Sequence, residues 1–329
     1  MTAWGVPARA TVIPETWPDG EALQGVRGES ITFPTRSPFT PGATKDHPLG
    51  SAKGLGTLFM PKNASPTNKV PAVVMLHGSA GVIGAREYTY GQQFAAMGFA
   101  ALVIDSFGAR RDRATDFIGR LMEITETMLV ADAYAGLEYL AKRGDVDAAR
   151  VALAGFSYGG MATTFAAYRQ IAETLGINGG RFAGHVAFYG PCIARFTDSR
   201  TTAAPLLFLS GSADAIVDPE RCEEIAGDLR KGGSSVEIVV YPGAYHQWDG
   251  ARSGPRNIGR NLAPCRFLVE PDGTVVDRQT PFTMNGPFTR KLILGLCTNS
   301  EGYLIGRDDE VRARSNRDFG RFLRHVFRL

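Results

Sequence analysis

A regular alternation of apolar strands and helical segments from residue 70 onward most constrains the fold of this chain. The first strand, 70–76, reads V-P-A-V-V-M-L, as a strand buried on both faces should. The other predicted strands are 31–34, 55–61, 99–105, 150–154, 182–189, 206–210 and 236–241. The predicted helices are 86–97, 116–143, 158–175, 219–231 and 315–327, the last with Ser315 as its N-cap. This order predicts parallel βαβ units, and therefore an α/β fold whose mostly parallel central sheet carries helices on both faces.

The chain has 329 residues, which we expect to form a single domain, 1–329, with two additions to the alternating core. Residues 1–27 read as an irregular N-terminal extension. Residues 250–312 form an insertion before the last helix, and they contain a predicted hairpin of 267–270 with 274–277. Two interpretations of the insertion stay open at this point. It is either a lid over the functional site or a surface elaboration with no part in catalysis.

Composition and charge restrict the classes of partner. The formal net charge is +3, from 36 basic and 33 acidic residues, which does not favour nucleic acid or a membrane surface. No stretch approaches the roughly 18 apolar residues of a membrane span. The first 20 residues lack the pattern of a signal peptide. We therefore expect a cytoplasmic protein if Met1 is the native start, and a periplasmic or secreted one if a signal peptide was removed. The oligomeric state stays open.

Four cysteines, none in a C-x-x-C spacing, argue against a zinc or redox motif. Four buried thiols and one or two disulfides are both compatible with this spacing, and disulfides would favour an exported protein. Cys192 follows the strand that ends at Tyr189, and Cys222 lies early in the helix after the next strand. If these strands are neighbours, the two cysteines come close enough to bond, so we predict a Cys192–Cys222 disulfide and leave Cys265 and Cys297 unassigned.

The segment 155–160 reads G-F-S-Y-G-G and matches G-x-S-x-G. The motif lies between a predicted strand and a predicted helix, where a sharp turn would hold Ser157 in a strained conformation with its hydroxyl above the sheet. Flanking side chains would collide with neighbouring backbone, which explains Gly155 and Gly159. The start of the following helix also favours negative charge. This context predicts a nucleophilic serine rather than an ordinary glycine-rich turn.

A serine nucleophile needs a base and an acid that orients the base. Of the five histidines, only His246 falls in a loop after a late strand, downstream of both the serine and a suitable acid. Asp214 follows the strand 206–210 and is the predicted acid. Asp218 is the rival, but it precedes Pro219 and is better placed to cap the next helix. The predicted catalytic triad is Ser157, Asp214 and His246.

Acyl transfer also needs two backbone N–H groups directed at the tetrahedral oxyanion. The residue after the nucleophile, Tyr158, is predicted to supply one. The glycine-rich segment 77–81, H-G-S-A-G, follows the strand 70–76 and is predicted to supply the other from Ser79. The alternative is an ordinary turn at the end of a strand.

Three arginines follow carboxyl ends of predicted strands, where ligands of open α/β sheets bind. They are Arg86, Arg110 and Arg111. One of them could hold a carboxylate on the substrate with two parallel hydrogen bonds. The competing interpretation is that they face solvent or pair with neighbours such as Glu87 and Asp112.

These motifs, taken together with D-S-F at 105–107, G-S-A-D at 211–214 and Y-P-G-A-Y-H at 241–246, resemble the dienelactone hydrolase family. The resemblance runs from about Val70 to Trp248, and the final helix also fits. It implies an α/β-hydrolase fold, hydrolysis of a small carboxylic ester or lactone, and no metal or organic cofactor. There are two departures. The enzymes that give the family its name use cysteine where this chain has Ser157, and they lack a long segment before the last helix.

Two alternative functions stay open. The elbow is similar to that of serine peptidases of the prolyl-oligopeptidase type, although the chain has no room for the propeller domain those enzymes usually carry. Some proteins of the α/β-hydrolase fold lose the triad and only bind ligands or partners. A complete set of triad candidates argues against the second alternative. The expected function is a serine esterase that works through an acyl-enzyme intermediate.

Overall fold

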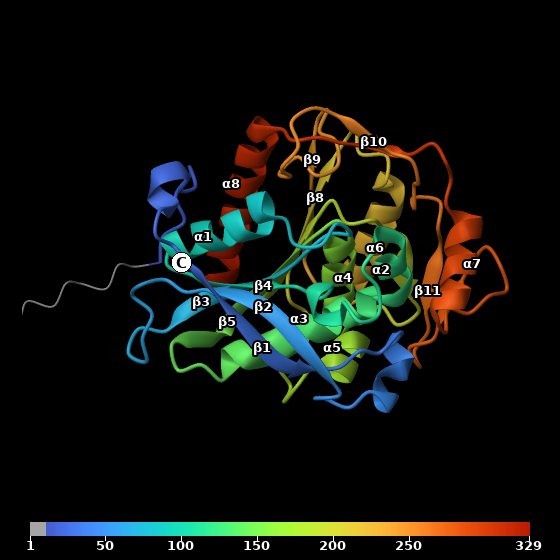
Figure 1. Ribbon diagram of the computed structural model, residues 1–329, viewed down its shortest axis with the longest axis horizontal. Coiled ribbons are helices and arrows are strands. Elements are labelled where there is room, and N and C mark those ends of the chain that lie inside the picture. The colour runs from blue at the N-terminus through green and yellow to red at the C-terminus, as the bar shows by residue number, and fades with distance from the viewer. Residues whose placement is uncertain (1–10) are drawn as a thin grey trace, which may run out of the picture.

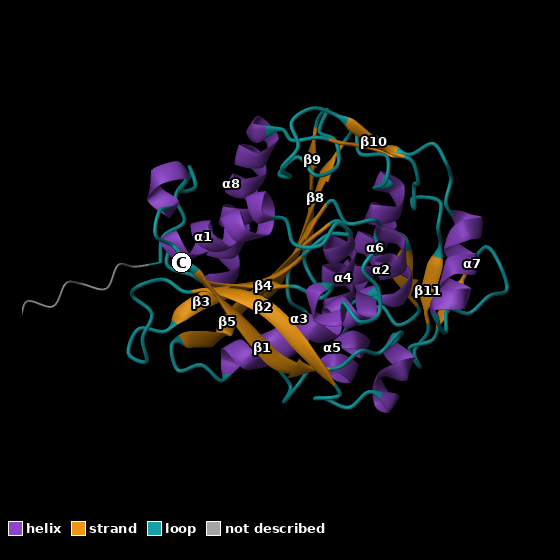
Figure 2. Ribbon diagram, in the orientation of Figure 1, coloured by secondary structure: helices purple, strands orange, loops and turns teal. Residues whose placement is uncertain are grey.

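A computed structural model describes residues 11–329 and confirms the predicted α/β fold, with one mostly parallel sheet between two layers of helices (Figures 1 and 2). The sheet has eight strands in the order β1-β2-β4-β3-β5-β6-β8-β9. Neighbouring strands from β4 to β9 are parallel, whereas β2 runs antiparallel to both β1 and β4. The strands are β1 (Gly28–Thr35), β2 (Ala52–Phe59), β3 (Val70–Leu76), β4 (Ala100–Ile104), β5 (Val146–Phe156), β6 (Gly184–Phe188), β8 (Leu206–Gly211) and β9 (Val236–Tyr241).

Helices α1 and α8 cover one face of this sheet, and α3 and α4 cover the other (Figure 1). No helix within residues 11–329 is both long and apolar enough to cross a membrane. The α-helices are α1 (Thr89–Ala96), α2 (Phe117–Glu123), α3 (Glu126–Ala141), α4 (Tyr158–Ala166), α5 (Arg169–Leu175), α6 (Pro219–Lys231), α7 (Pro287–Cys297) and α8 (Asp309–Phe327). Shorter helical turns are η1 (Gly20–Leu23), η2 (Pro41–Asp46), η3 (Gly84–Tyr88) and η4 (Gly108–Arg110).

The apolar core includes part of the predicted N-terminal extension. Trp17 is buried, and its ring lies 5.2 Å from that of Phe94 on α1 and 5.8 Å from that of Phe319 on α8. Aromatic rings at such separations stabilise a core beyond the area they bury. The described part of the extension is therefore anchored to the first and last helices, while residues 1–10 lie outside the described residues.

Two predicted helices are each divided into two, which corrects the sequence-based boundaries. The segment 116–143 contains α2 and α3, separated by extended backbone at Ile124 and Thr125. The segment 158–175 contains α4 and α5, separated at Tyr168, whose ring stacks on Phe196 at 3.9 Å. The carbonyl of Ile124 accepts a hydrogen bond from the Tyr158 hydroxyl at 2.9 Å. Both interruptions coincide with contacts to distant residues, which local periodicity does not reveal.

The last helix begins earlier than predicted, and its N-cap is not Ser315. Helix α8 starts at Asp309, and the Asp308 carboxylate caps it by accepting from the Val311 N–H at 2.9 Å. The first helical residues are mainly charged and carry little apolar periodicity, so they read as part of the insertion. Ser315 lies buried inside the helix, where its hydroxyl accepts a hydrogen bond from the Trp248 indole at 3.1 Å.

The strand order brings the loops after β3 and β5 together. Leu76, the last residue of β3, is in register with Gly155 of β5. From β3 the chain moves to β4 on one side and later returns to β5 on the other side. Such a reversal opens a crevice at the carboxyl ends of the strands, which is where open α/β sheets bind ligands. The H-G-S-A-G segment and the G-x-S-x-G segment therefore meet at this edge.

The insertion is folded and attached to the core. The predicted hairpin is confirmed as β11 (Phe267–Val269) paired antiparallel with β12 (Val275–Asp277), and β11 also pairs with β7 (Ala194–Phe196) of the core. Strand β10 (Arg256–Ile258) pairs antiparallel with β13 (Tyr303–Ile305). In the view of Figure 1, α7 and β11 both lie toward the right-hand edge of the molecule, away from β1 and β3.

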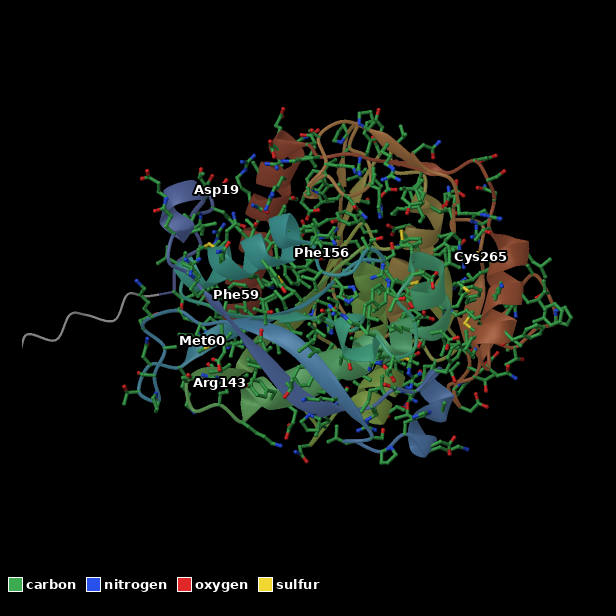
Figure 3. The ribbon with its side chains drawn as sticks, viewed as in Figure 1. Asp19, Phe59, Met60, Arg143, Phe156 and Cys265 are labelled. Atoms are coloured by element: carbon green, nitrogen blue, oxygen red, sulfur yellow. A yellow bond between two sulfur atoms is a disulfide. The ribbon has the colours of Figure 1, made fainter. Side chains whose placement is uncertain are left out.

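Two disulfides stabilise this side of the molecule. The predicted Cys192–Cys222 bond is confirmed, and Cys265 pairs with Cys297 inside the insertion. Figure 3 labels Cys265 close to α7. The second disulfide joins the segment before β11 to the end of α7, so it fixes the two sides of the insertion to each other.

We predict that the double substitution Cys265→Ala/Cys297→Ala lowers the free energy of unfolding by about 3–4 kcal/mol, because a cross-link across some thirty residues restricts the unfolded chain. Urea denaturation of wild type and variant measures the change. Peptide mapping without reductant checks that Cys192–Cys222 persists in the variant. Equal denaturation midpoints with equal slopes would contradict a stabilising role for this disulfide.

Candidate active site

Ser157 occupies a strained turn between β5 and α4, as predicted. Its backbone has φ 53° and ψ −112°, and residues other than glycine rarely adopt a positive φ. The turn is held by the Ser157 N–H, which donates to the Phe188 carbonyl of β6 at 2.9 Å. A Cβ on Gly155 would lie 2.1 Å from the Gly159 carbonyl oxygen, and one on Gly159 would lie 2.4 Å from that of Leu76. Both glycines are therefore required by the close approach of backbones.

The structure brings the three predicted triad residues into one hydrogen-bonded chain. His246 Nε2 lies 2.8 Å from Ser157 Oγ, and His246 Nδ1 lies 2.7 Å from Asp214 Oδ2. All three residues are buried. With Nδ1 carrying the proton toward Asp214, Nε2 is free to accept the serine proton. The arrangement can therefore activate the hydroxyl as a nucleophile.

Two tyrosine rings hold the imidazole of His246 in this orientation. The Tyr189 ring lies 4.7 Å away, and the Tyr303 ring from the insertion lies 5.1 Å away, both edge-to-face. The Tyr189 hydroxyl donates to Asp249 Oδ1 at 2.5 Å. Burial and the adjoining Asp249 carboxylate raise the pKa of the Tyr189 phenol above its ordinary value, so the ring stays neutral beside the histidine.

Asp218, the rival acid, lies outside this chain. Its carboxylate caps α6 by accepting from the N–H groups of Glu220 and Arg221, as predicted, and it also pairs with Arg266 at 3.2 Å. Asp214 instead faces His246 and accepts a further hydrogen bond from the Ile216 N–H at 3.2 Å. The geometry therefore favours Asp214 as the acid.

Ser79 and Tyr158, the two predicted oxyanion donors, line one pocket with Ser157. Tyr158 is the first residue of α4, so its N–H has no acceptor within the helix. A Cβ on Gly78 would lie 3.3 Å from the Ser157 Cβ, which shows how closely the 77–81 loop approaches the nucleophile. Both residues therefore lie beside Ser157, and their role as oxyanion donors stays a prediction.

The pocket beside Ser157 has a volume of about 290 Å³ and is mainly apolar. Its walls come from α2, from the core and from the insertion, with Leu121, Met161, Ile216, Leu262 and Leu294 among the lining residues. A second cavity of about 380 Å³ shares Ser79, Phe117, Ile258 and Tyr303 with this pocket. Two cavities of a size for a small substrate therefore lie next to each other at this site.

Arg86 is buried and does not face either cavity, which corrects its prediction as a substrate-binding residue. Its guanidinium donates to Glu87 Oε1 at 2.6 Å and to the Tyr189 hydroxyl at 3.3 Å, and it lies over the Phe156 ring at 4.9 Å. Burial alone would lower the pKa of Arg86, but the Glu87 carboxylate raises it above its ordinary value. Arg86 therefore supports Tyr189, which packs on the catalytic histidine. Phe156 lies near the centre of the molecule in Figure 3.

Arg110 and Arg111 are also placed away from the site. Arg110 is buried in a two-point ion pair with Asp132, at 2.6 and 2.9 Å, and donates to Ser37 at 2.9 Å. Arg111 is exposed and lines neither cavity. All three arginines follow strand ends as predicted, but their positions along the chain do not determine the direction of their long side chains.

The arginines that do line the site come from the insertion and were missed in the sequence. Arg252, Arg256 and Arg307 line the second cavity, and Arg260 and Arg290 line the apolar pocket. Among the described residues, Arg252 and Arg256 have no carboxylate partner within ion-pair distance. A signal existed in the composition of 250–312, which is rich in arginine, but its irregular pattern did not place any one of them near Ser157.

Hydrogen bonds from the insertion fix the main chain of the loops that carry Asp214 and His246. The N–H of His246 donates to the Leu304 carbonyl at 3.0 Å, and its carbonyl accepts from the Gly306 N–H at 3.0 Å. The Asn261 side chain donates to the Ala215 carbonyl, next to Asp214, at 2.9 Å. The segment is therefore a wall of the site, fixed to the loops that carry the base and the acid.

Comparison with known proteins places this geometry in a family. The model of the "Dienelactone hydrolase family" matches residues 56–257, which is more than half of the chain. A Bradyrhizobium protein named "Probable 2-oxo-3-(5-oxofuran-2-ylidene)propanoate lactonase" is 26% identical over 200 residues, covering 55% of this chain and 74% of that protein.

Among solved structures, the apo form of Thermogutta terrifontis esterase 2 is similar, with a TM-score of 0.51 and 17% identity over 70% of this chain and 87% of that one. The same esterase phosphoramylated by tabun matches with a TM-score of 0.50 and 17% identity, over 65% and 85% of the two chains. These structures share the fold. Because the family model matches more than half of the chain, from the end of β2 through the segments of Ser157, Asp214 and His246, this chain belongs to the dienelactone hydrolase family.

Proposed function

We propose that this protein is a serine hydrolase that cleaves a small carboxylic ester or lactone through a covalent acyl-enzyme intermediate. The observation that carries the proposal is the buried chain of Asp214, His246 and Ser157, joined at 2.7 and 2.8 Å. Membership of a hydrolase family and the similarity to a lactonase support the reaction class. Asp214, His246 and Ser157 follow the acid, base and nucleophile roles of the serine triad.

In the first half of the reaction, Ser157 Oγ attacks the carbonyl carbon while His246 Nε2 takes the hydroxyl proton. The carbonyl oxygen becomes an oxyanion, and the N–H groups of Ser79 and Tyr158 stabilise it. The tetrahedral intermediate then breaks its bond to the alcohol oxygen, which receives the proton from His246. In a lactone, the freed hydroxyl stays attached to the acyl chain.

In the second half, water attacks the acyl-enzyme carbonyl and gives its proton to His246 Nε2. The second tetrahedral intermediate expels Ser157 Oγ, which recovers the proton, and the carboxylic acid leaves. Asp214 keeps the imidazole in one tautomer and stabilises its cationic form in both halves. The protein needs no further group for this sequence of steps.

The shape of the site supports a small substrate with one apolar end. The pocket of about 290 Å³ beside Ser157 fits a short or medium acyl group, since its lining is mainly apolar. The second cavity contains three arginines and no acidic lining residue. It is therefore suited to an anionic group on the same substrate, the role first predicted for Arg86, Arg110 and Arg111.

Two other functions are weaker. A prolyl-oligopeptidase-type peptidase would turn over an aminoacyl amide at least as well as a simple ester. A non-catalytic binding protein would not react with a fluorophosphonate. The Thermogutta esterase phosphoramylated by tabun shows that a protein of this fold takes an organophosphorus group. Esters, matched amides and a fluorophosphonate probe therefore separate the three functions.

The two disulfides also support a location. We infer that the protein works in an oxidising compartment, such as the periplasm or the extracellular space, because disulfides persist there and are rare in reducing cytosol. Fractionation of the native host, with detection of the intact protein, tests this inference.

We predict that Ser157→Ala lowers kcat for a short-chain ester by about 10⁴–10⁶-fold, because removing a member of the triad removes the nucleophilic route. The far-ultraviolet circular dichroism spectrum should match that of the wild type. Mass spectrometry of wild type treated with a fluorophosphonate should locate the adduct on the peptide that contains Ser157. A variant that retains most of the wild-type rate would exclude this nucleophile.

We predict that Asp214→Asn lowers kcat by about 10⁴-fold, because an amide favours the wrong tautomer of His246. Asp218→Asn is the matched control, since it changes the rival carboxylate that caps α6. It should leave kcat within about twofold and change the thermal stability little, because the asparagine oxygen can still accept from these N–H groups and asparagine caps a helix about as well as aspartate. The reverse order of kcat for these variants would make Asp218 the acid.

We predict a preference for anionic esters that depends on the second cavity. The butyrate ester of 3-carboxybenzyl alcohol should be hydrolysed with a higher kcat/KM than a neutral analogue. In this analogue, the same butyrate ester has its carboxylate masked as a methyl ester. The double substitution Arg252→Gln/Arg256→Gln should lower the ratio of kcat/KM for the anionic ester to kcat/KM for the neutral ester by about tenfold. This is the size expected for a lost charge-assisted contact. Arg111→Gln, at an exposed position outside both cavities, is the control. Equal kcat/KM for the two esters with wild type would leave the arginines without this role.

A further inference from the structure

Arg290 connects the insertion to the residue that follows the nucleophile. It lies on α7, is almost fully buried, and lines the same pocket as Ser157. Its Nη2 donates to Glu126 Oε2 at 2.9 Å and to the Tyr158 hydroxyl at 3.1 Å. Its Nε donates to the carbonyl of Leu121, near the end of α2, at 2.8 Å. One guanidinium therefore fixes three segments around the nucleophile elbow.

The hydrogen bonds at the Tyr158 hydroxyl have a defined direction. A guanidinium only donates, so the phenol oxygen accepts from Arg290. The single phenol proton is then available for the Ile124 carbonyl at 2.9 Å or for Glu126 Oε2 at 3.1 Å. The side chain is also stacked on Phe107, at 6.5 Å between ring centres. Tyr158 is thus fixed at its hydroxyl and at the strained turn where its backbone begins.

The buried charges of this cluster balance each other. Burial alone would raise the pKa of the Glu126 carboxyl, but the Arg290 guanidinium lowers it below its ordinary value. Both groups are therefore charged and paired. A buried ion pair contributes little net stability compared with well-packed apolar residues of similar volume. Stability alone therefore does not explain this buried charged pair beside Ser157.

We propose that Arg290 is a positioning residue for the oxyanion hole. Through the Tyr158 hydroxyl it fixes the orientation of Tyr158, whose main-chain N–H stabilises the oxyanion of acyl transfer. The inference rests on the proposed function, and it makes the insertion a working part of the catalytic apparatus. Arg290 touches no reacting atom, so its effect on the reaction passes through Tyr158.

The test compares Arg290→Met, Arg290→Lys and Tyr158→Phe with wild type in the hydrolysis of a neutral butyrate ester. Complete loss of one oxyanion donor costs about 10²–10³-fold in kcat, so a displaced donor should cost about tenfold or more. We expect that loss in kcat for Arg290→Met and Tyr158→Phe, with KM within about twofold because the contact acts mainly in the transition state. Arg290→Lys, which still donates, should recover part of the rate.

A tetrahedral mimic separates positioning from a merely structural role. An alkylboronic acid forms a tetrahedral adduct with a catalytic serine, whereas butyrate binds as the planar product. For Arg290→Met, the affinity for the boronic acid should fall in proportion to kcat/KM, and the affinity for butyrate should not change. A general loosening of the pocket would weaken both ligands alike and would overturn the proposal.

The double variant Arg290→Met/Tyr158→Phe tests the route of the effect. If Arg290 acts through the Tyr158 hydroxyl, the double variant should be no slower than the slower single variant. Effects that multiply would overturn the proposal. Should Arg290→Met not fold, Tyr158→Phe and Arg290→Lys carry the same comparison.

The matched control is Arg266→Met. Arg266 also joins the insertion to the core, through its ion pair with Asp218 at 3.2 Å, but it lines neither substrate cavity. It should leave kcat and boronic-acid affinity unchanged. A loss equal to that of Arg290→Met would show that any break between insertion and core lowers the rate, which overturns a specific role. An active wild type with an unaffected Arg290→Met overturns this inference alone, whereas a wild type without esterase activity overturns the proposed function as well.

Discussion

The close approach of three backbones at the carboxyl ends of β3 and β5 is the constraint on which the site depends. The end of β3, the turn at Ser157 and the first residues of α4 pack with no side chains between them, because a Cβ on Gly155 or Gly159 would overlap a neighbouring carbonyl. This packing places the serine hydroxyl above the sheet. It also brings the loop that holds Ser79 next to Ser157, which is the arrangement that the proposed oxyanion hole requires.

The insertion completes the site that this packing begins. Strand β13 holds the backbone of His246, Asn261 holds the turn beside Asp214, and Arg290 holds the side chain of Tyr158. The Cys265–Cys297 disulfide and the pairing of β11 with β7 fix the segment internally and to the core. So many attachments are expected of a rigid wall, because a lid that opens needs a segment with few buried contacts.

The parts of the fold that were predicted from sequence are those with local signals. Strand β3 and helix α6 were placed residue for residue, because one is apolar throughout and the other is bounded by Pro219 and by glycines. The three triad residues are predictable because each follows the end of a strand and because they occur in the order serine, acid, histidine along the chain. The predictions were wrong where contacts with other parts of the structure determine the outcome. Two predicted helices are interrupted where the Ile124 carbonyl accepts from Tyr158 and where Tyr168 stacks on Phe196. Arg86 and Arg110 are turned inward, where they pair with Glu87 and Asp132.

The buried arginines near the candidate site are paired rather than free. Arg86, Arg110 and Arg290 are each matched by a buried carboxylate, so their fields largely cancel at a distance. Their hydrogen bonds remain, and these fix Tyr189 and Tyr158 beside the base and the oxyanion hole. In the proposed mechanism, the developing negative charge meets fixed amide dipoles, which need no rearrangement as the reaction proceeds. Arg252 and Arg256 of the second cavity lack such partners among the described residues, so an anionic group bound in that cavity would meet net positive charge.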